Sequence, residues 1–327
     1  MGYLGKNLSI DRMRAFAGRL RKLIMNEPSS TPFNQQDSAF GDPIAAAEYD
    51  KQIFDSWIRQ LERWVGRTDN LDILEVGPGI SLGAQLLLVG RGNRVTVIDP
   101  YPPHWHGSFH PAVYRHLGSL VGGSELLQQS ADAGTFDRIP IRRLVEPAHD
   151  LHSLRDSEFD VVLSNAVMEH VRELNRVCGE FARVTKTNGA NIHQIDLGYH
   201  KNRDRPLDHL LMSEREFFAE AEAANFEYGN RWRASEFTAR FQRAGFVVKN
   251  ASVSQRADAA YVSEVQAQSK GLRRSYGLWP AEDLGVLSML LVAFRVPTIT
   301  SKMKGSAAVA SQKMRKMRSR LNLGGSA

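Results

Sequence analysis

The sequence predicts an α/β fold of the Rossmann-like, doubly wound kind, and three observations predict it. An apolar run at residues 71–76 ends in two closely spaced glycines, Gly77 and Gly79, and a helical pattern opens directly behind them. A second apolar run at residues 94–98 places Asp99 roughly 20 residues further on, the spacing of a βαβ nucleotide site. Apolar runs then keep alternating with helical patterns, as a parallel sheet requires.

Helical patterns precede the sheet. Residues 10–26 predict a basic amphipathic helix, which a linker joins to the sheet-containing part of the chain at about residue 45. A second helix, predicted at 45–65, packs on the sheet by one apolar face. That face contains Tyr49, Ile53, Trp57, Leu61 and Trp64. The first strand begins at Leu71, and a helix from Leu82 to about residue 89 follows it.

The later elements leave room for two inserted cap segments, at about 100–139 and 196–231. The predicted strands and helices, in chain order, are strand three before residue 146, strand four from 159, a helix at 171–184, a turn at 189, strand five, a helix at 232–244, and last strands near 246–249 and 286–296. The segment between the last two strands is too long for a tight hairpin loop. Residues 298–327 are predicted to be a basic, flexible tail.

The composition predicts a cytoplasmic protein. The 327 residues are 42% hydrophobic and 24% charged, which is ordinary for a soluble globular chain. A single cysteine, Cys178, excludes an internal disulfide and is expected to be a small buried side chain. No signal peptide is recognisable, and no apolar run reaches the ~18 residues of a membrane span.

The net charge of +6 comes from the two ends of the chain. Between them lie 29 basic and 35 acidic residues, which argues against a nucleic-acid groove across the central domain. The basic ends leave one alternative open: a non-catalytic module that binds a membrane surface or a partner protein through them.

Glu75 decides which cofactor the glycine-rich turn favours. A carboxylate just before Gly77 would repel the pyrophosphate of a dinucleotide, and Ser81 interrupts the glycine pattern that such cofactors need. The same carboxylate suits a ligand that carries an ammonium, and Asp99 suits a ribose. S-adenosylmethionine has both groups and no phosphate, so a dehydrogenase is disfavoured.

At this point the chain resembles the class I S-adenosylmethionine-dependent methyltransferases. The acidic-x-Gly-x-Gly motif, Asp99, the segment from Phe159 to Val171 and the segment from Phe181 to Gly189 match the family in order over about residues 45–297. The resemblance implies a seven-stranded sheet with an antiparallel last strand. It implies cofactor contacts by Glu75, Gly77, Pro78, Gly79, Asp99, Ala148, His149 and Asn165.

Three polar residues near the ends of strands four and five are the candidates for catalysis. A hydroxyl acceptor must lose its proton, for which a histidine is well suited. His170 follows strand four, and His200 follows Asp196 after strand five. His193 is a third histidine at this edge. The sequence leaves open which of the histidines, if any, is the base.

The expected acceptor is a small molecule. The residues after strand four lack the prolines of nucleobase amino-methyltransferases, and they resemble small-molecule O-methyltransferases instead. A looser resemblance, which includes Asn230, is to methyltransferases of bacterial surface-glycan synthesis, so a saccharide hydroxyl is the leading acceptor. No metal is expected, because the segment His104–His116 lacks the cysteines and carboxylates usual in a closed site. Acceptor contact by that aromatic segment is favoured.

Overall fold

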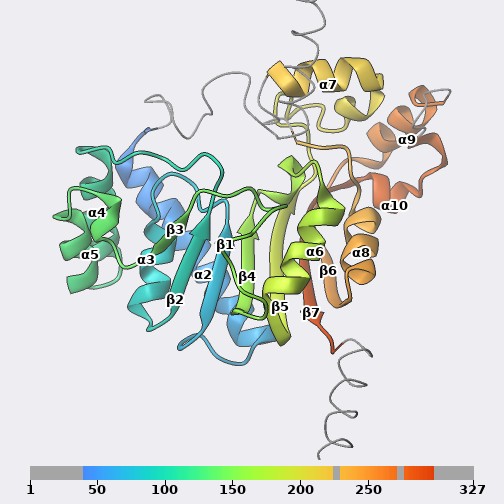
Figure 1. Ribbon diagram of the computed structural model, residues 1–327. Coiled ribbons are helices and arrows are strands. Elements are labelled where there is room, and N and C mark those ends of the chain that lie inside the picture. The colour runs from blue at the N-terminus through green and yellow to red at the C-terminus, as the bar shows by residue number, and fades with distance from the viewer. Residues whose placement is uncertain (1–39, 224–228, 271–275, 298–327) are drawn as a thin grey trace, which may run out of the picture.

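The computed structural model describes residues 40–223, 229–270 and 276–297, which form one seven-stranded sheet in the order β3-β2-β1-β4-β5-β7-β6 (Figure 1). The first five strands of this order run parallel, and β7 is antiparallel to β5 and to β6. The strands are β1 (Asp72–Val76), β2 (Arg94–Ile98), β3 (Arg142–Leu144), β4 (Phe159–Asn165), β5 (Thr185–Asp196), β6 (Phe246–Arg256) and β7 (Val286–Arg295). The predicted fold class is confirmed.

Two hydrophobic cores cover the two faces of the sheet. The first contains α2 (Pro43–Trp64), α3 (Gly83–Gly90) and strand residues such as Ile73, and the second contains α6 (Leu174–Val184), α8 (Ala234–Arg243) and strand residues such as Leu74. Neighbouring residues of β1 therefore point to opposite faces, and both faces are apolar because helices bury both. Figure 1 shows α6 and α8 on the face opposite α2.

The predicted apolar face of α2 is confirmed except at its first residue, since Ile53, Trp57, Leu61 and Trp64 all pack in the first core. Trp57 and Leu61 are buried as expected, but Tyr49 is 54% exposed, and Asp50 takes the buried position. Ala47, Asp50, Trp57 and Leu61 follow helical spacing, so the stripe that faces the sheet includes one carboxylate. The predicted face was therefore wrong by one position at its beginning.

The segment at 100–139 packs into the helical layer on one face of the sheet. It forms α4 (Phe109–Leu120) and α5 (Glu125–Ala131), and α4 packs against α2. Phe109 and Tyr114 belong to the first core, and the His110 ring stacks on Trp105 at 4.9 Å. These aromatic side chains thus stabilise the helical layer, in contrast to the expected contact with an acceptor.

The second inserted segment does reach the carboxyl edge of the parallel strands. It contains the 3-10 helix η5 (Asp208–Leu211) and α7 (Glu214–Ala223), and Figure 1 shows α7, α9 (Ala259–Gln268) and α10 (Ala281–Leu284) on that side of the molecule. Leu207 and Leu210 pack with apolar residues of α9 and α10 in a separate small core. Within the described ranges, no helix is both long and apolar enough to cross a membrane.

Two predicted boundaries moved. The turn expected at Gly189 is a bulge inside β5, where pairing with β4 shifts register and Asn188 has a φ of 66°. The helix expected at 171–184 begins at Leu174, after a 3-10 turn, η4 (Met168–His170). The predicted helix at 10–26 and the tail at 298–327 lie outside the described residues.

Candidate functional site

The glycine-rich loop after β1 is shaped to receive a ligand. Gly77 and Gly79 have φ values of 65° and 76°, in the left-handed region that favours glycine. A Cβ on Gly77 would lie 2.5 Å from a methyl group of Val167, whereas a Cβ on Gly79 would meet nothing within 4 Å. The backbone at Gly79 thus borders open space at the carboxyl edge, beside the reversal of strand order between β1 and β4.

Side chains from three helices hold this loop from behind. The Ser81 hydroxyl donates to Oδ2 of Asp50 at 2.6 Å, and the Tyr114 hydroxyl donates to the Ser81 carbonyl at 2.7 Å. Nε2 of Gln85 donates to Oε2 of Glu75 at 2.8 Å and lies 3.3 Å from the Pro78 carbonyl. Ser81, which replaces a third glycine, is therefore a fixed point of the loop.

Two buried carboxyl groups lie under the loop. Burial raises the pKa of Glu75 to about 7, against the hydrogen bond from Gln85, and the charge of Asp50 adds to the rise. Burial likewise raises the pKa of Asp50 to about 7, although Ser81 and the Gly83 amide donate to it. A cation bound at the loop would favour the ionised form of Glu75.

The other predicted cofactor residues lie along the same edge. Asp99 directly follows β2, and its Oδ1 accepts the Tyr101 amide at 2.7 Å, which fixes the orientation of the carboxylate. Ala148 and His149 are half-buried in the loop after β3. Asn165 ends β4, and its Nδ2 donates to the Tyr49 hydroxyl at 3.0 Å.

A second cluster of polar side chains lies where β4 and β5 end. Glu169 and His170 lie on η4, and His200 lies in the loop after Asp196. The rings of His170 and His200 are 5.1 Å apart, Nε2 of His200 is 3.5 Å from Oδ2 of Asp196, and Nε2 of His170 is 3.9 Å from Oε1 of Glu169. The structure thus brings together the three residues selected for catalysis and adds Glu169.

The two carboxyl groups of this cluster differ in charge state. Burial raises the pKa of Glu169 well above its usual range, and the charge of Asp196 contributes to the rise. Burial would also raise the pKa of Asp196, but hydrogen bonds from His200 and from the Gly198 amide hold that pKa below its usual value. Asp196 is therefore ionised at neutral pH and can stabilise a positive charge on His200.

The comparisons with known proteins agree with this geometry. A family model described as a methyltransferase domain matches residues 74–192, which include the glycine-rich loop, β2 and β4. The human thiol S-methyltransferase TMT1A is 28% identical over 130 residues, which are 40% of this chain and 44% of that protein. The chain thus matches under half of the length of this curated relative.

Solved structures of similar shape include two methyltransferases. One is an S-adenosylmethionine-dependent methyltransferase from Methanosarcina mazei, at 18% identity and a TM-score of 0.44, covering 73% of this chain and 97% of that one. The other is geranyl diphosphate C-methyltransferase from Streptomyces coelicolor, at 15% identity and a TM-score of 0.42, covering 79% and 87%.

The match at residues 74–192 supports the assignment of the chain to the class I S-adenosylmethionine-dependent methyltransferases. The predicted family and its cofactor, S-adenosylmethionine, are confirmed. The loop of this methyltransferase also fits that cofactor: open space borders Gly79, a buried carboxylate lies at Glu75, and an oriented carboxylate lies at Asp99. The individual contacts of the predicted residues, including Pro78, Ala148 and His149, stay predictions.

Two histidines, His193 and His110, have structural roles in the methyltransferase. His193 is fully buried, stacks on Phe181 at 5.3 Å, and bonds to Ser164 through Nδ1 at 2.8 Å. Burial lowers the pKa of His193 to about 3, so it is neutral in the core. His110 lies 3.0 Å from the Ile80 carbonyl through Nε2 and supports the glycine-rich loop.

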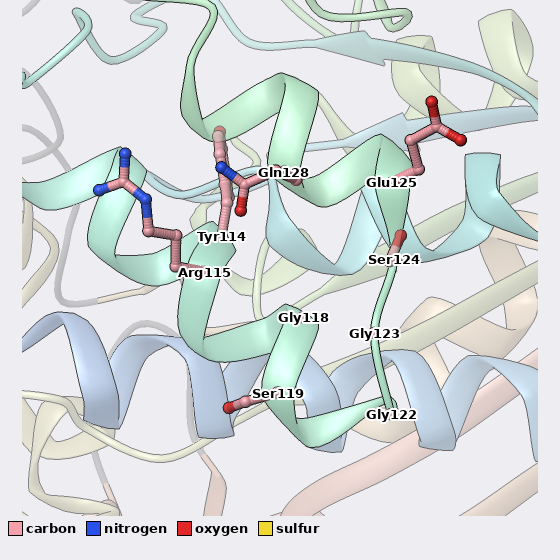
Figure 2. Close-up of a pocket in the computed structure, with 9 residues that line it drawn as sticks. All are labelled: Tyr114, Arg115, Gly118, Ser119, Gly122, Gly123, Ser124, Glu125 and Gln128. Atoms are coloured by element: carbon pink, nitrogen blue, oxygen red, sulfur yellow. The ribbon is translucent and has the colours of Figure 1, made fainter.

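Figure 2 shows a separate hollow between α4 and α5. Its lining residues are Tyr114, Arg115, Gly118, Ser119, Gly122, Gly123, Ser124, Glu125 and Gln128. None of them is a predicted site residue, although Tyr114 also holds the loop through Ser81. The hollow is therefore separate from the predicted site residues, which lie at the carboxyl edge of the sheet.

Sequence reasoning missed Tyr49, Asp50 and Glu169. Burial raises the pKa of the Tyr49 hydroxyl, against the bond from Asn165, and the charges of Asp50, Glu75 and Glu169 add to the rise. Its bond from Asn165, the last residue of β4, brings the Tyr49 hydroxyl to the carboxyl edge of the sheet. An aspartate on the apolar stripe of α2 was the one signal in the sequence that could have revealed this helix as part of the site.

Proposed function

We propose that this methyltransferase transfers a methyl group to a hydroxyl of a saccharide or of another small molecule. The observation that carries the proposal is the group of His170, His200 and Asp196 at the carboxyl edge, one strand away from the cofactor loop. This surface is rich in polar groups, and Asn165 and Tyr49 extend it toward the glycine-rich loop. Such a lining suits an acceptor with several hydroxyl groups better than an apolar one.

The residues of the chain would act on the acceptor by alignment and by proton removal. S-adenosylmethionine supplies a methyl group on a positively charged sulfur, so the acceptor oxygen needs orientation and a place for its proton. His200 accepts that proton, and the ionised Asp196 stabilises the imidazolium that forms. His170 packs edge-on against His200 and restricts the rotation of its ring.

A thiol is the second candidate acceptor, because the human relative is named as a thiol S-methyltransferase. The same base would serve a thiol, whose ordinary pKa is already close to neutral pH, at about 8.5. The competing proposal from another class is a module without turnover that binds a membrane or a partner through the basic ends of the chain.

Binding and transfer measurements separate these proposals. Calorimetry with S-adenosylmethionine and, in parallel, NADH should show binding of the first alone. Labelled methyl transfer is then measured over saccharide and thiol panels. His200→Ala should keep cofactor affinity and lose about 10²- to 10⁴-fold in turnover. His104→Ala, on the exposed loop before α4, is the control.

Three results would count against the proposal. Binding of neither cofactor would favour the module without turnover, and vesicles of anionic lipid would then test its basic ends. Transfer to thiols alone would replace the proposed hydroxyl acceptor by a thiol. Full turnover in His200→Ala would remove the assigned base.

A further inference from the structure

We propose that Glu169, His170 and His200 form a site for one divalent transition-metal ion, and that Zn²⁺ fits it best. One ligand atom from each residue lies within 4.8 Å of the ligand atoms of the other two. Catalytic zinc sites use three protein ligands of this kind, such as two histidines and one glutamate, and keep a fourth position open. Mg²⁺ and Ca²⁺ instead require sets of oxygen ligands.

The ligand atoms lie further apart than in an occupied zinc site, but within 4.8 Å of one another. In a tetrahedral zinc site the ligand atoms lie about 3.3 Å from one another. Nε2 of His170 is 3.9 Å from Oε1 of Glu169, so these two atoms need to approach by about 0.6 Å. His170 and His200 keep partly exposed side chains, and small rotations of their rings can bring both nitrogens onto one ion.

Glu169 is the independent observation that points to a ligand. It is 1% exposed, and neither carboxylate oxygen accepts a well-formed hydrogen bond from any residue in the described ranges. A buried carboxylate without such a partner is costly, and a bound cation would supply the partner. Asp196 places a further negative charge beside His200. A cation that displaces the proton of Glu169 leaves two carboxylates beside neutral imidazoles, and their charge balances that of a divalent ion.

The backbone around the ligands is held firmly. Nδ2 of Asn230 donates to the carbonyls of Met168 and Val171, each at 3.0 Å, and its backbone amide donates to the Glu169 carbonyl. On the other side, the Tyr199 amide donates to the Pro206 carbonyl at 2.8 Å. Both ligand-bearing segments are therefore fixed before an ion arrives, as an effective metal site requires.

The place of the site suggests its use. Its open position would bind the acceptor oxygen or sulfur and lower the pKa of that group, so the proton leaves to solvent. The lone pair of the acceptor then forms the bond to the methyl carbon, and the electrons of the carbon–sulfur bond return to the cofactor sulfur. In the metal-bound protein, His200 is a ligand and no longer the base. This use rests on the proposed function, whereas the metal site itself does not.

Metal titration of the full chain, without a histidine tag, tests the site. Metal-free protein is titrated with Zn²⁺ against a chromogenic chelator, and with Co²⁺ while visible absorption is recorded. We expect one Zn²⁺ per chain at micromolar affinity or tighter, and no competition from Mg²⁺. Glu169→Gln and His200→Ala should each weaken binding at least tenfold. His104→Ala removes a histidine from the other histidine-rich segment and should change nothing.

Fold and cofactor affinity are followed in every variant by circular dichroism and by S-adenosylmethionine calorimetry. The proposal is overturned by a stoichiometry near zero, by unchanged affinity in Glu169→Gln and His200→Ala, or by a loss in His104→Ala. Zinc binding without S-adenosylmethionine binding would refute the proposed function and leave the metal site. Methyl transfer by protein that binds no metal would refute the metal site and leave the proposed function.

Discussion

Glu75 should make cofactor affinity depend on pH. Its buried carboxyl group has a pKa of about 7, against an ordinary value of 4.5. Only the ionised carboxylate attracts an ammonium, so below pH 7 the free protein must lose a proton before S-adenosylmethionine can bind well. Affinity therefore falls as the pH falls through 7.

The magnitude follows from the two pKa values. If the bound ammonium returns the pKa of Glu75 to its ordinary value, proton linkage raises the affinity about 20-fold between pH 5.5 and pH 7.5. At pH 6, binding should release about 0.9 proton per chain. Calorimetry in buffers with different ionisation enthalpies measures that number directly.

Glu75→Gln is the matched variant, since it keeps the shape of the side chain and removes the titration. It should bind more weakly above pH 7 and show a flat dependence on pH. A flat wild-type profile would refute the placement of the ammonium beside Glu75. An equal slope in Glu75→Gln would assign the titration to another group, with Asp50 the first candidate.

Three further predictions concern the loop and its surroundings. The raised pKa of Asp50 means that the folded chain holds this proton more tightly than the unfolded chain. The free energy of unfolding should therefore fall by about 2 to 3 kcal/mol from pH 5 to pH 7.5. Urea titrations of Asp50→Asn should lack most of that fall, and an unchanged dependence of the unfolding free energy on pH would contradict the assignment. Gly83→Ala places a Cβ 2.2 Å from the Asp50 carboxylate and should lose about 1 to 3 kcal/mol of stability, whereas Gly118→Ala, on α4 with nothing within 4 Å, should lose none. Asp99→Ala should weaken S-adenosylmethionine binding about 10- to 100-fold in calorimetry, with Asp69→Ala as the exposed control, and unchanged affinity would remove Asp99 from the site.

The sequence predicted best those strands that are buried on both faces. β2 was predicted at its observed residues, because a short apolar run bounded by turn residues allows few other structures. β5 begins at Thr185, before the turn that the sequence predicted at residue 189, since Asn188 and Gly189 have the composition of a turn but occupy a bulge. A Cβ on Gly189 would lie 2.8 Å from a backbone oxygen, which shows that packing and not chain reversal requires this glycine.

The site was predictable where local motifs form it and not where tertiary packing does. Asp99 follows a strand, and its position at the edge follows from the topology alone. Asp50 and Glu169 act through burial and through neighbours distant in the chain, and only Asp50 leaves a trace in the sequence, as a carboxylate on an apolar helical stripe. His193 and His200 could not be separated by sequence, because one residue type takes opposite roles when its ring is stacked in the core or left at the edge.

The bond from Ser81 to Asp50 bears on how this protein can be divided. A shortened chain that starts at Leu71 would keep every residue matched by the family model, yet it would lose the carboxylate that holds the loop and the buried side chains of Trp57 and Leu61. In chimeras between relatives, α2 and the loop of residues 77–83 should therefore be exchanged together. The smallest unit that can be inherited or transplanted in this protein is larger than its recognisable motif.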